Sequence, residues 1–193
     1  RGEGGEISPE LFRRFQEGSY TAMEEIVALL HVRLIAYLAM MTPNREMAEE
    51  IAQDALLKAY QERQCFYDET KLLPWLFVTA RRMVYRETSK KKHTSEIGVD
   101  NELLDLFAAS MEQFPQKAEV FQKQIQQHLA DCLLQLSTTD RELIQLRFFA
   151  GLKIREISEI LDMPMGSVGV KLRRALDKLK DELEKKGVKR EVL

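Results

Sequence analysis

The side chains best suited to do chemistry in this sequence follow the stretch Met163-Pro-Met-Gly166. Lys171, Arg173, Arg174 and Lys178 lie within one predicted helix after it. Lysine neutralises phosphate as a compact charge, and arginine can also donate paired hydrogen bonds to the edge of a guanine. The N-terminus of a helix attracts phosphate with its free N–H groups. These residue types in this order are typical of a nucleic-acid contact.

The elements around these cations have the spacing of a helix-turn-helix. A short helix is predicted at Ile154–Leu161, and a tight turn leads to a longer helix that carries the cations. In a helix-turn-helix the second helix can lie in the major groove of DNA. An αα-hairpin with solvated charges has the same spacing, so both readings stay open at this point. The predicted buried positions of the longer helix are Val168, Leu172, Leu176, Leu179 and Leu183.

A second basic segment lies in the first half of the chain. A helix is predicted from Pro74, in its first turn, through Lys91, and the only acid from Lys71 to Lys92 is Glu87. Residues 93–115 carry the opposite charge, because they contain no lysine or arginine, and we interpret them as an acidic linker. A short amphipathic helix is predicted inside it at Asn101–Met111. Two basic helices separated by an acidic segment favour a nucleic-acid partner over a helical adaptor.

A first short helix is predicted to begin at Ser8-Pro9. Further helices are predicted at Tyr20–Met41, Arg45–Arg63 and Ala118–Leu136. Another is predicted to start near Ser137 and to run to Ala150, where Gly151 ends it. The Arg45–Arg63 helix is expected to bury one face and to expose a polar face that also carries a leucine. The predicted buried residues are Ala48, Ile51, Ala52, Ala55 and Ala59. The predicted exposed residues are Glu50, Gln53, Asp54, Leu57 and Gln61.

Composition limits the fold and the function classes. Hydrophobic residues make up 45% and charged residues 31%, with nine Gly and five Pro, so we expect an all-α fold of two small helical domains. The net charge is −2, so any polyanion site depends on local segregation of charge. The two cysteines and three histidines show no metal or catalytic spacing, and we expect no metal, no cofactor and no enzymatic activity. No apolar run is long enough to span a bilayer and no signal peptide is recognisable, so we expect a cytoplasmic location.

Three segments resemble motifs of the extracytoplasmic-function sigma factors, which are compact two-domain members of the bacterial sigma-70 family. AEEIAQDALLKAY (Ala48–Tyr60) is similar to the helix that binds the polymerase clamp. PWLFVTARRMVYRETSKKK (Pro74–Lys92) is similar to the segment of promoter melting and −10 recognition. EISEILDMPMGSVGVKLRRAL (Glu156–Leu176) is similar to the −35 recognition motif. The three segments follow one another in the family's order and the resemblance covers nearly the whole chain.

The resemblance implies a non-enzymatic protein that binds core RNA polymerase, recruits it to promoter DNA and opens the duplex. It implies region 2 at residues 7–92, a linker at 93–115, region 4 with its helix-turn-helix at 116–186, and an anti-sigma partner. By the same resemblance, Glu50, Gln53, Asp54 and Leu57 contact the polymerase. The implied −10 DNA contacts are Gln64, Phe66, Tyr67, Lys71, Arg81, Arg82, Arg86 and Lys90. The implied −35 DNA contacts are Ser167, Gly169, Val170, Lys171, Arg173 and Arg174.

The loop Gln64–Lys71 falls where the family captures an unstacked base, although Phe66 can instead pack beneath the loop. The sequence also departs from the family. Arg82 and Arg86 stand where members usually have Asn and Asp, and Gly169 and Val170 stand at positions that often carry Arg or Lys and Ser. These changes predict that phosphate contact and groove shape outweigh base reading.

Two other functions compete with this interpretation. A helix-turn-helix regulator would bind duplex operators tightly without polymerase, usually as a symmetric dimer. A helical interaction protein would bind no DNA even at low salt, whereas a sigma factor should bind a forked promoter fragment with an affinity that falls steeply as salt rises.

Overall fold

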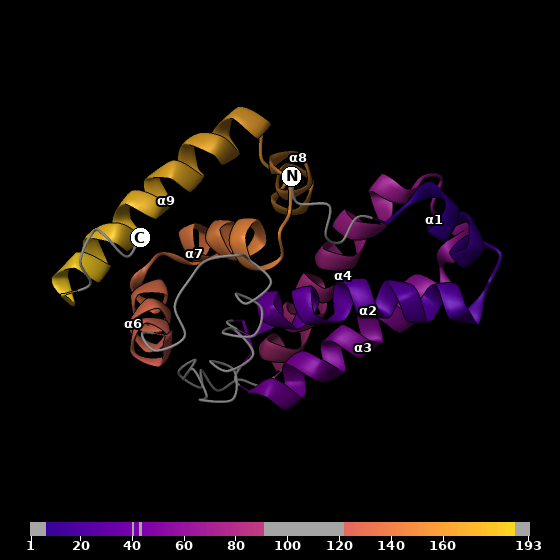
Figure 1. Cartoon of the computed structure of the whole chain (residues 1–193), viewed down its shortest axis with the longest axis horizontal. Coiled ribbons are helices and arrows are strands. Elements are labelled where there is room, and N and C mark those ends of the chain that lie inside the picture. Colours follow the sequence, from indigo (N-terminus) through magenta and orange to yellow (C-terminus); the bar gives the residue numbers. More distant parts are fainter. Residues whose placement is uncertain (1–6, 40, 43, 91–121, 188–193) are drawn as a thin grey trace. The chain divides into compact units, whose positions relative to one another are not determined.

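The structure is a computed structural model that describes residues 7–39, 41–42, 44–90 and 122–187. Its helices form two compact units, α1 to α4 and α6 to α9, which are coloured in sequence order in Figure 1. No strand occurs among the described residues, and the prediction of an all-α fold is confirmed. Residues 93–115, including the helix expected at Asn101–Met111, lie outside the described residues.

The N-terminal unit contains α1 (Pro9–Gln16), α2 (Tyr20–Leu38), α3 (Arg45–Gln61), the 3-10 turn η1 (Arg63–Cys65) and α4 (Glu69–Lys90). Helices α2, α3 and α4 pack against one another, and the rings of Tyr37 on α2 and Phe77 on α4 lie 5.3 Å apart in the core. Alanines such as Ala52 and Ala55 are fully buried on α3 and allow close approach of the helices. The packing therefore holds the outer faces of α3 and α4 in a defined orientation.

The start of α4 differs from the sequence prediction. The helix begins at Glu69, so Pro74 lies inside it and not in its first turn. Pro74 has no N–H to donate to the carbonyl of Thr70, which weakens the helix locally. Leu72 is nevertheless fully buried, as are Leu76 and Phe77. The burial of Leu72 upstream of the proline favours continuation of the helix, so tertiary packing outweighs the local preference.

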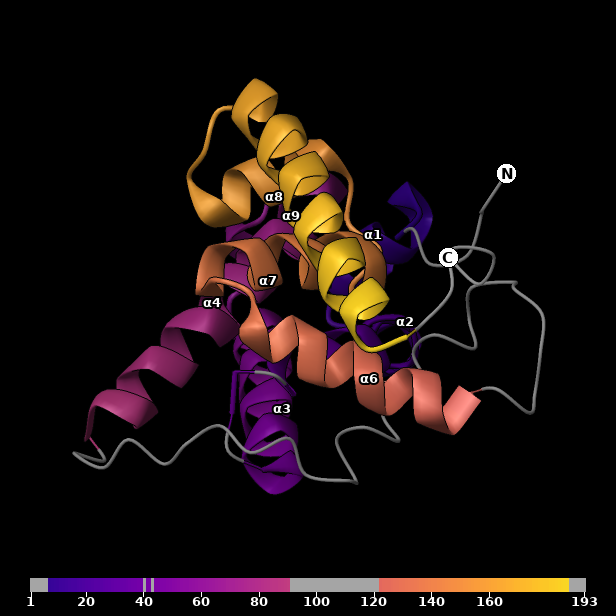
Figure 2. The same cartoon turned by 90° about the vertical axis from the view of Figure 1, so that its left-hand side faces the viewer.

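The C-terminal unit contains α6 (Gln122–Gln135), α7 (Thr138–Ile144), the π-helical segment η2 (Gln145–Phe149), α8 (Ile154–Leu161) and α9 (Met165–Lys185), which Figure 2 shows from the side. The Ser137 side chain caps α7 by accepting the N–H of Asp140 at 3.2 Å. Gly151 has a φ of 65° and ends η2, as the sequence predicted. The predicted regular helix up to Ala150 widens instead, because Ala150 N–H donates to Gln145 O at 2.9 Å, five residues back.

None of the helices in the described residues is long and apolar enough to cross a bilayer. The same residues contain no cluster of three or more His, Cys, Asp or Glu side chains that could bind a metal ion. The two cysteines are free thiols: Cys65 is exposed, and Cys132 is buried in the C-terminal unit, where burial raises the pKa of its thiol.

Candidate functional site

The outer face of α3 exposes all four residues expected to contact polymerase. Glu50, Gln53 and Asp54 are exposed. Leu57 lies one turn further along and is 54% exposed, a large fraction for a leucine. The opposite face is buried against α2 and α4, which fixes the direction of the exposed one. The surface therefore combines two carboxylates and an amide with one apolar side chain.

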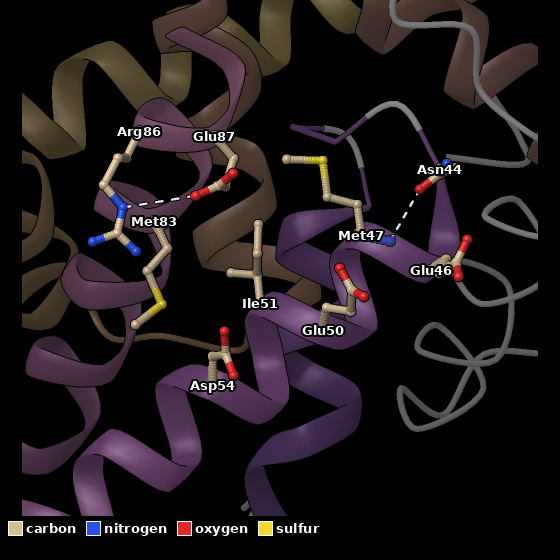
Figure 3. Close-up of a pocket in the computed structure, with 9 residues that line it drawn as sticks. All are labelled: Asn44, Glu46, Met47, Glu50, Ile51, Asp54, Met83, Arg86 and Glu87. Atoms are coloured by element: carbon tan, nitrogen blue, oxygen red, sulfur yellow. Dashed lines mark hydrogen bonds and ion pairs between the residues drawn. The ribbon is translucent and has the colours of Figure 1, made fainter. Parts of the chain in front are cut away.

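A groove of about 360 Å³ joins this face to α4. Figure 3 shows Ile51 of α3 and Met83 of α4 between the charged side chains. Glu50 and Asp54 line it from α3, and Arg86 lines it from α4. The expected polymerase face and one of the cations expected to contact DNA therefore share one groove, although Asp54 and Arg86 are far apart in the sequence.

The cations of α4 differ in their surroundings. Arg82 and Arg86 are exposed, and Arg86 pairs with its neighbour Glu87 at 3.8 Å, in a solvent-exposed ion pair that contributes little to stability. The Arg81 guanidinium lies 5.0 Å from the centre of the Tyr85 ring, in a cation–π contact that keeps it near the helix surface. Lys90 is the last residue of α4. Helical spacing thus places Arg82 and Arg86 in one row, with Arg81 beside it.

The loop between α3 and α4 separates its two aromatic residues. Phe66 is 5% exposed, and its ring packs edge-on against Trp75 with 5.2 Å between centroids. Tyr67 is 78% exposed. Of the two residues expected to contact DNA, Phe66 is therefore a packing residue in this structure, because its ring is covered by α4. Tyr67 presents the aromatic surface of the loop to solvent.

The end of the loop is held by a cap on α4. The Asp68 carboxylate accepts hydrogen bonds from the N–H of Thr70, at 2.8 Å, and from its hydroxyl group. The hydroxyl bond lowers the pKa of Asp68, which keeps the carboxylate charged at the helix N-terminus. Gln64 is exposed and Lys71 is half-buried. The residues on both sides of Tyr67 are consequently constrained.

The turn between α8 and α9 is tight. Asp162 has a φ of 51°, in the left-handed region, and Met163 N–H donates to Ser158 O at 3.1 Å. The Ser158 hydroxyl donates to Met163 O at 2.5 Å. Helix α9 then begins at Met165, which is 55% exposed and which sequence reasoning did not single out. The sequence signal that could have indicated an exposed Met165 is its position directly after Pro164, in the first turn of the expected recognition helix.

The outer face of α9 carries the residues expected at the −35 element. Val168, Leu172 and Ala175 are buried on the inner side, and Leu176, expected there, is only half-buried. Val170 is 53% exposed, and a Cβ placed on Gly169 would meet nothing within 4 Å. The fold of the chain therefore does not require glycine at position 169. Ser167 is half-buried, and Gly169, Lys171, Arg173 and Arg174 are exposed.

Lys178 has a structural partner that sequence reasoning missed. Its ammonium group lies 2.5 Å from Oδ2 of Asp140, a residue 38 positions earlier in α7. Burial raises the pKa of Asp140, but hydrogen bonds from Lys178 and Ser137 outweigh it and leave the pKa below its ordinary value. Lys178 therefore links α9 to α7 and is less available to phosphate than the three cations before it.

Comparison with known proteins agrees with this arrangement. Residues 26–94 match the family model of sigma-70 region 2, and residues 126–179 match that of sigma-70 region 4. The fold and its two matched regions define a sigma-70-type transcription factor. More specifically, the chain belongs to the extracytoplasmic-function group of the sigma-70 family.

Two curated relatives show the extent of the match. The RNA polymerase sigma factor CarQ of Myxococcus xanthus is 24% identical over 170 residues, which cover 88% of this chain and 94% of CarQ. The ECF RNA polymerase sigma factor SigM of Bacillus subtilis is 27% identical over 158 residues, which cover 82% of this chain and 93% of SigM.

Two solved structures share the fold. CnrH in complex with the cytosolic domain of CnrY aligns with a TM-score of 0.65 at 20% identity, covering 92% of this chain and 97% of CnrH. RpoE of Bartonella quintana in complex with the anti-sigma factor NepR aligns with a TM-score of 0.59 at 21% identity, covering 83% of this chain and 96% of RpoE.

Proposed function

We propose that the chain binds core RNA polymerase and directs it to promoter DNA, with region 2 in residues 7–92, a linker in 93–115 and region 4 in 116–186. The observation that carries this proposal is that α3 exposes acidic and polar side chains, whereas α4 and α9 expose cations, which suit contacts with polymerase, single-stranded DNA and duplex DNA respectively. The matches to regions 2 and 4 support it. The proposed role is non-enzymatic, with no metal or cofactor, and the proposed location is the cytoplasm.

Polymerase contact is assigned to the α3 face. Glu50, Asp54 and Gln53 can pair with basic and polar side chains of the polymerase clamp, and Leu57 can enter an apolar pocket at the centre of the contact. An exposed leucine surrounded by polar groups suits an interface that forms and separates, because its apolar area stays small in the free protein. Charge reversal at Asp54 should therefore weaken assembly with core enzyme.

Contact with the −10 element is assigned to the α3–α4 loop and the cations of α4. An aromatic ring beside cations is the combination that single-stranded DNA requires, since bases stack on the ring while the cations follow the phosphates. Tyr67 provides the ring. The proposed cations are Arg81, Arg82, Arg86 and Lys90, with Gln64 and Lys71 in the loop.

Contact with the −35 element is assigned to α9. The exposed side chains of Lys171, Arg173 and Arg174 are proposed to contact phosphates and base edges, and Ser167 lies near the helix N-terminus. Because the chain's own fold leaves open space at Gly169, we propose that the missing side chain permits close approach of DNA, with Val170 against a thymine methyl group. Sharp −35 base preferences that are lost in Arg173→Ala but unaffected by substitutions of Val170 would contradict a dominance of groove shape and phosphate contact.

An anti-sigma protein is the proposed regulatory partner. The RpoE structure of Bartonella quintana contains the anti-sigma factor NepR, and the CnrH structure contains the cytosolic domain of CnrY. The likeness of this chain to both supports a partner of the same kind. The acidic residues 93–115 are proposed to run through basic channels of the polymerase.

Run-off transcription with core RNA polymerase on a library of promoter sequences tests the function directly. Transcripts that start at defined promoters only when the chain is present are the expected result. A gel shift with and without core enzyme separates the competing function. A stand-alone regulator would bind tightly without polymerase, whereas a sigma factor gains specificity in the holoenzyme.

A further inference from the structure

Helix α1 and the α3–α4 loop are joined by two reciprocal side-chain contacts. Gln16, the last residue of α1, donates from Nε2 to the carbonyl oxygen of Phe66 at 2.6 Å. Gln64 donates from its own Nε2 to the carbonyl oxygen of Gln16 at 2.5 Å. The first pair is separated by 50 residues and the second by 48. Each amide therefore satisfies a backbone carbonyl on the other segment.

The base of the loop is tied to the same segment. The Tyr60 hydroxyl donates to Gly18 O at 2.9 Å, and the Arg63 guanidinium lies 4.6 Å from the centre of the Tyr60 ring. Gly18 has a φ of 85°, and a Cβ at this position would lie 3.1 Å from Nη2 of Arg63. The backbone conformation therefore favours glycine, and a Cβ would also lie tight against the guanidinium group, which could shift by a few tenths of an ångström.

These contacts constrain the peptide that leads to Tyr67. The Phe66 ring is held in the core against Trp75, and the Phe66 carbonyl is held by Gln16. Fixing the ring and the carbonyl of one residue fixes the plane of the next peptide. On the other side, Asp68 is held by its hydrogen bonds to Thr70. The exposed Tyr67 lies between these two anchored residues.

We infer that Gln16 is a positioning residue for single-stranded DNA, which holds the peptide after Phe66 so that the Tyr67 ring meets an unpaired base. The inference rests on the proposed function and adds α1 to the DNA-binding apparatus. Residues 9–16 precede the segment 26–94 that matches region 2, so the family match does not assign this role. A backbone that is already fixed before DNA binds loses less conformational entropy when the Tyr67 ring stacks on a base.

The test uses full-length chain with core RNA polymerase and a promoter library whose non-template −10 region is randomised inside a preformed bubble. RNA yield for each sequence gives the base preference at each position. Gln16→Met keeps an uncharged side chain of similar length but removes the Nε2 donor of the bond to Phe66 O. It should reduce the preference about threefold, which is within the range for one lost hydrogen bond. The loss should fall at the same position where Tyr67→Ala removes the preference, because the modest sequence preferences of single-strand binding arise from differences in stacking strength.

The combined variant distinguishes positioning from a general structural effect. If Gln16 acts through Tyr67, adding Gln16→Met to Tyr67→Ala should change the preference no further. Gln135→Met removes an exposed glutamine of the other unit and is the matched control, which should behave as wild type. Tyr60→Phe removes only the hydroxyl bond to Gly18 and is the substitute test if Gln16→Met unfolds the chain. It should reduce the base preference at the same position, by less than Gln16→Met.

Two results overturn the inference. One is a wild-type base preference that Tyr67→Ala abolishes while Gln16→Met and Tyr60→Phe leave it unchanged. The other is a loss from Gln16→Met that persists in full in the Tyr67→Ala background. Both leave the proposed function intact, because transcription still depends on the chain. A wild-type chain that supports no transcription from any library member would instead overturn the proposed function together with this inference.

Discussion

Leu57→Ala is the sharpest test of the α3 face. Full burial of a leucine side chain contributes about 1.5–3 kcal/mol. Since 54% of Leu57 is exposed in the free chain, about 0.8–1.6 kcal/mol is available when a partner covers it. Loss of that contribution raises the Kd for core polymerase by roughly fourfold to fifteenfold. The unfolding midpoint of the chain should fall only slightly, because about half of the removed side chain already lies in water.

The assay is a competition titration in which unlabelled variants displace a fluorescently labelled wild-type chain from core enzyme. Tyr20→Ala is the matched control, since Tyr20 is 73% exposed on α2 and lies outside the α3 face. It should compete as well as wild type. An unchanged Kd for Leu57→Ala would refute the assignment of this face. So would a Kd that rises only in proportion to a loss of folding stability, because Leu57 would then be a packing residue.

Three further predictions concern stability and DNA binding. Asp140→Asn should lower the free energy of unfolding by about 1 kcal/mol at pH 7. The pKa of Asp140 is depressed in the folded chain, so the carboxylate stabilises the fold fully above its unfolded pKa of about 4. This stabilisation is lost as the pH falls through the folded pKa. The acid denaturation curves of the variant and the wild type should therefore converge at low pH. Arg82→Ala and Arg173→Ala should each reduce the slope of log affinity against log salt by about one in holoenzyme–promoter titrations, and an unchanged slope would exclude phosphate contact. Gly18→Ala should cost about 1–2 kcal/mol of stability in urea melts, because alanine is strained at a φ of 85°.

The helix faces of this protein were predictable from local pattern. Glu50, Asp54 and Leu57 are exposed because alanines at helical spacing occupy the other side of α3, and Arg173 and Arg174 are exposed because Val168 and Leu172 point inward. A period of 3.6 residues encodes which side of a helix is buried, whatever the helix packs against. The same pattern, read together with the acidic segment between the two basic helices, predicted an all-α chain with separated charge.

Long-range packing decided the details that local pattern leaves open. Phe66 and Tyr67 are adjacent aromatic residues, yet only Phe66 is buried, because Trp75 of α4 covers its ring. Lys178 belongs to the same helix as Arg174 but pairs with Asp140, 38 residues earlier. Such contacts join residues that are distant along the chain, and no periodicity within one helix records which distant residue will arrive beside it. The sequence therefore determines the faces that are presented, and the packed fold determines which side chains on them are already engaged.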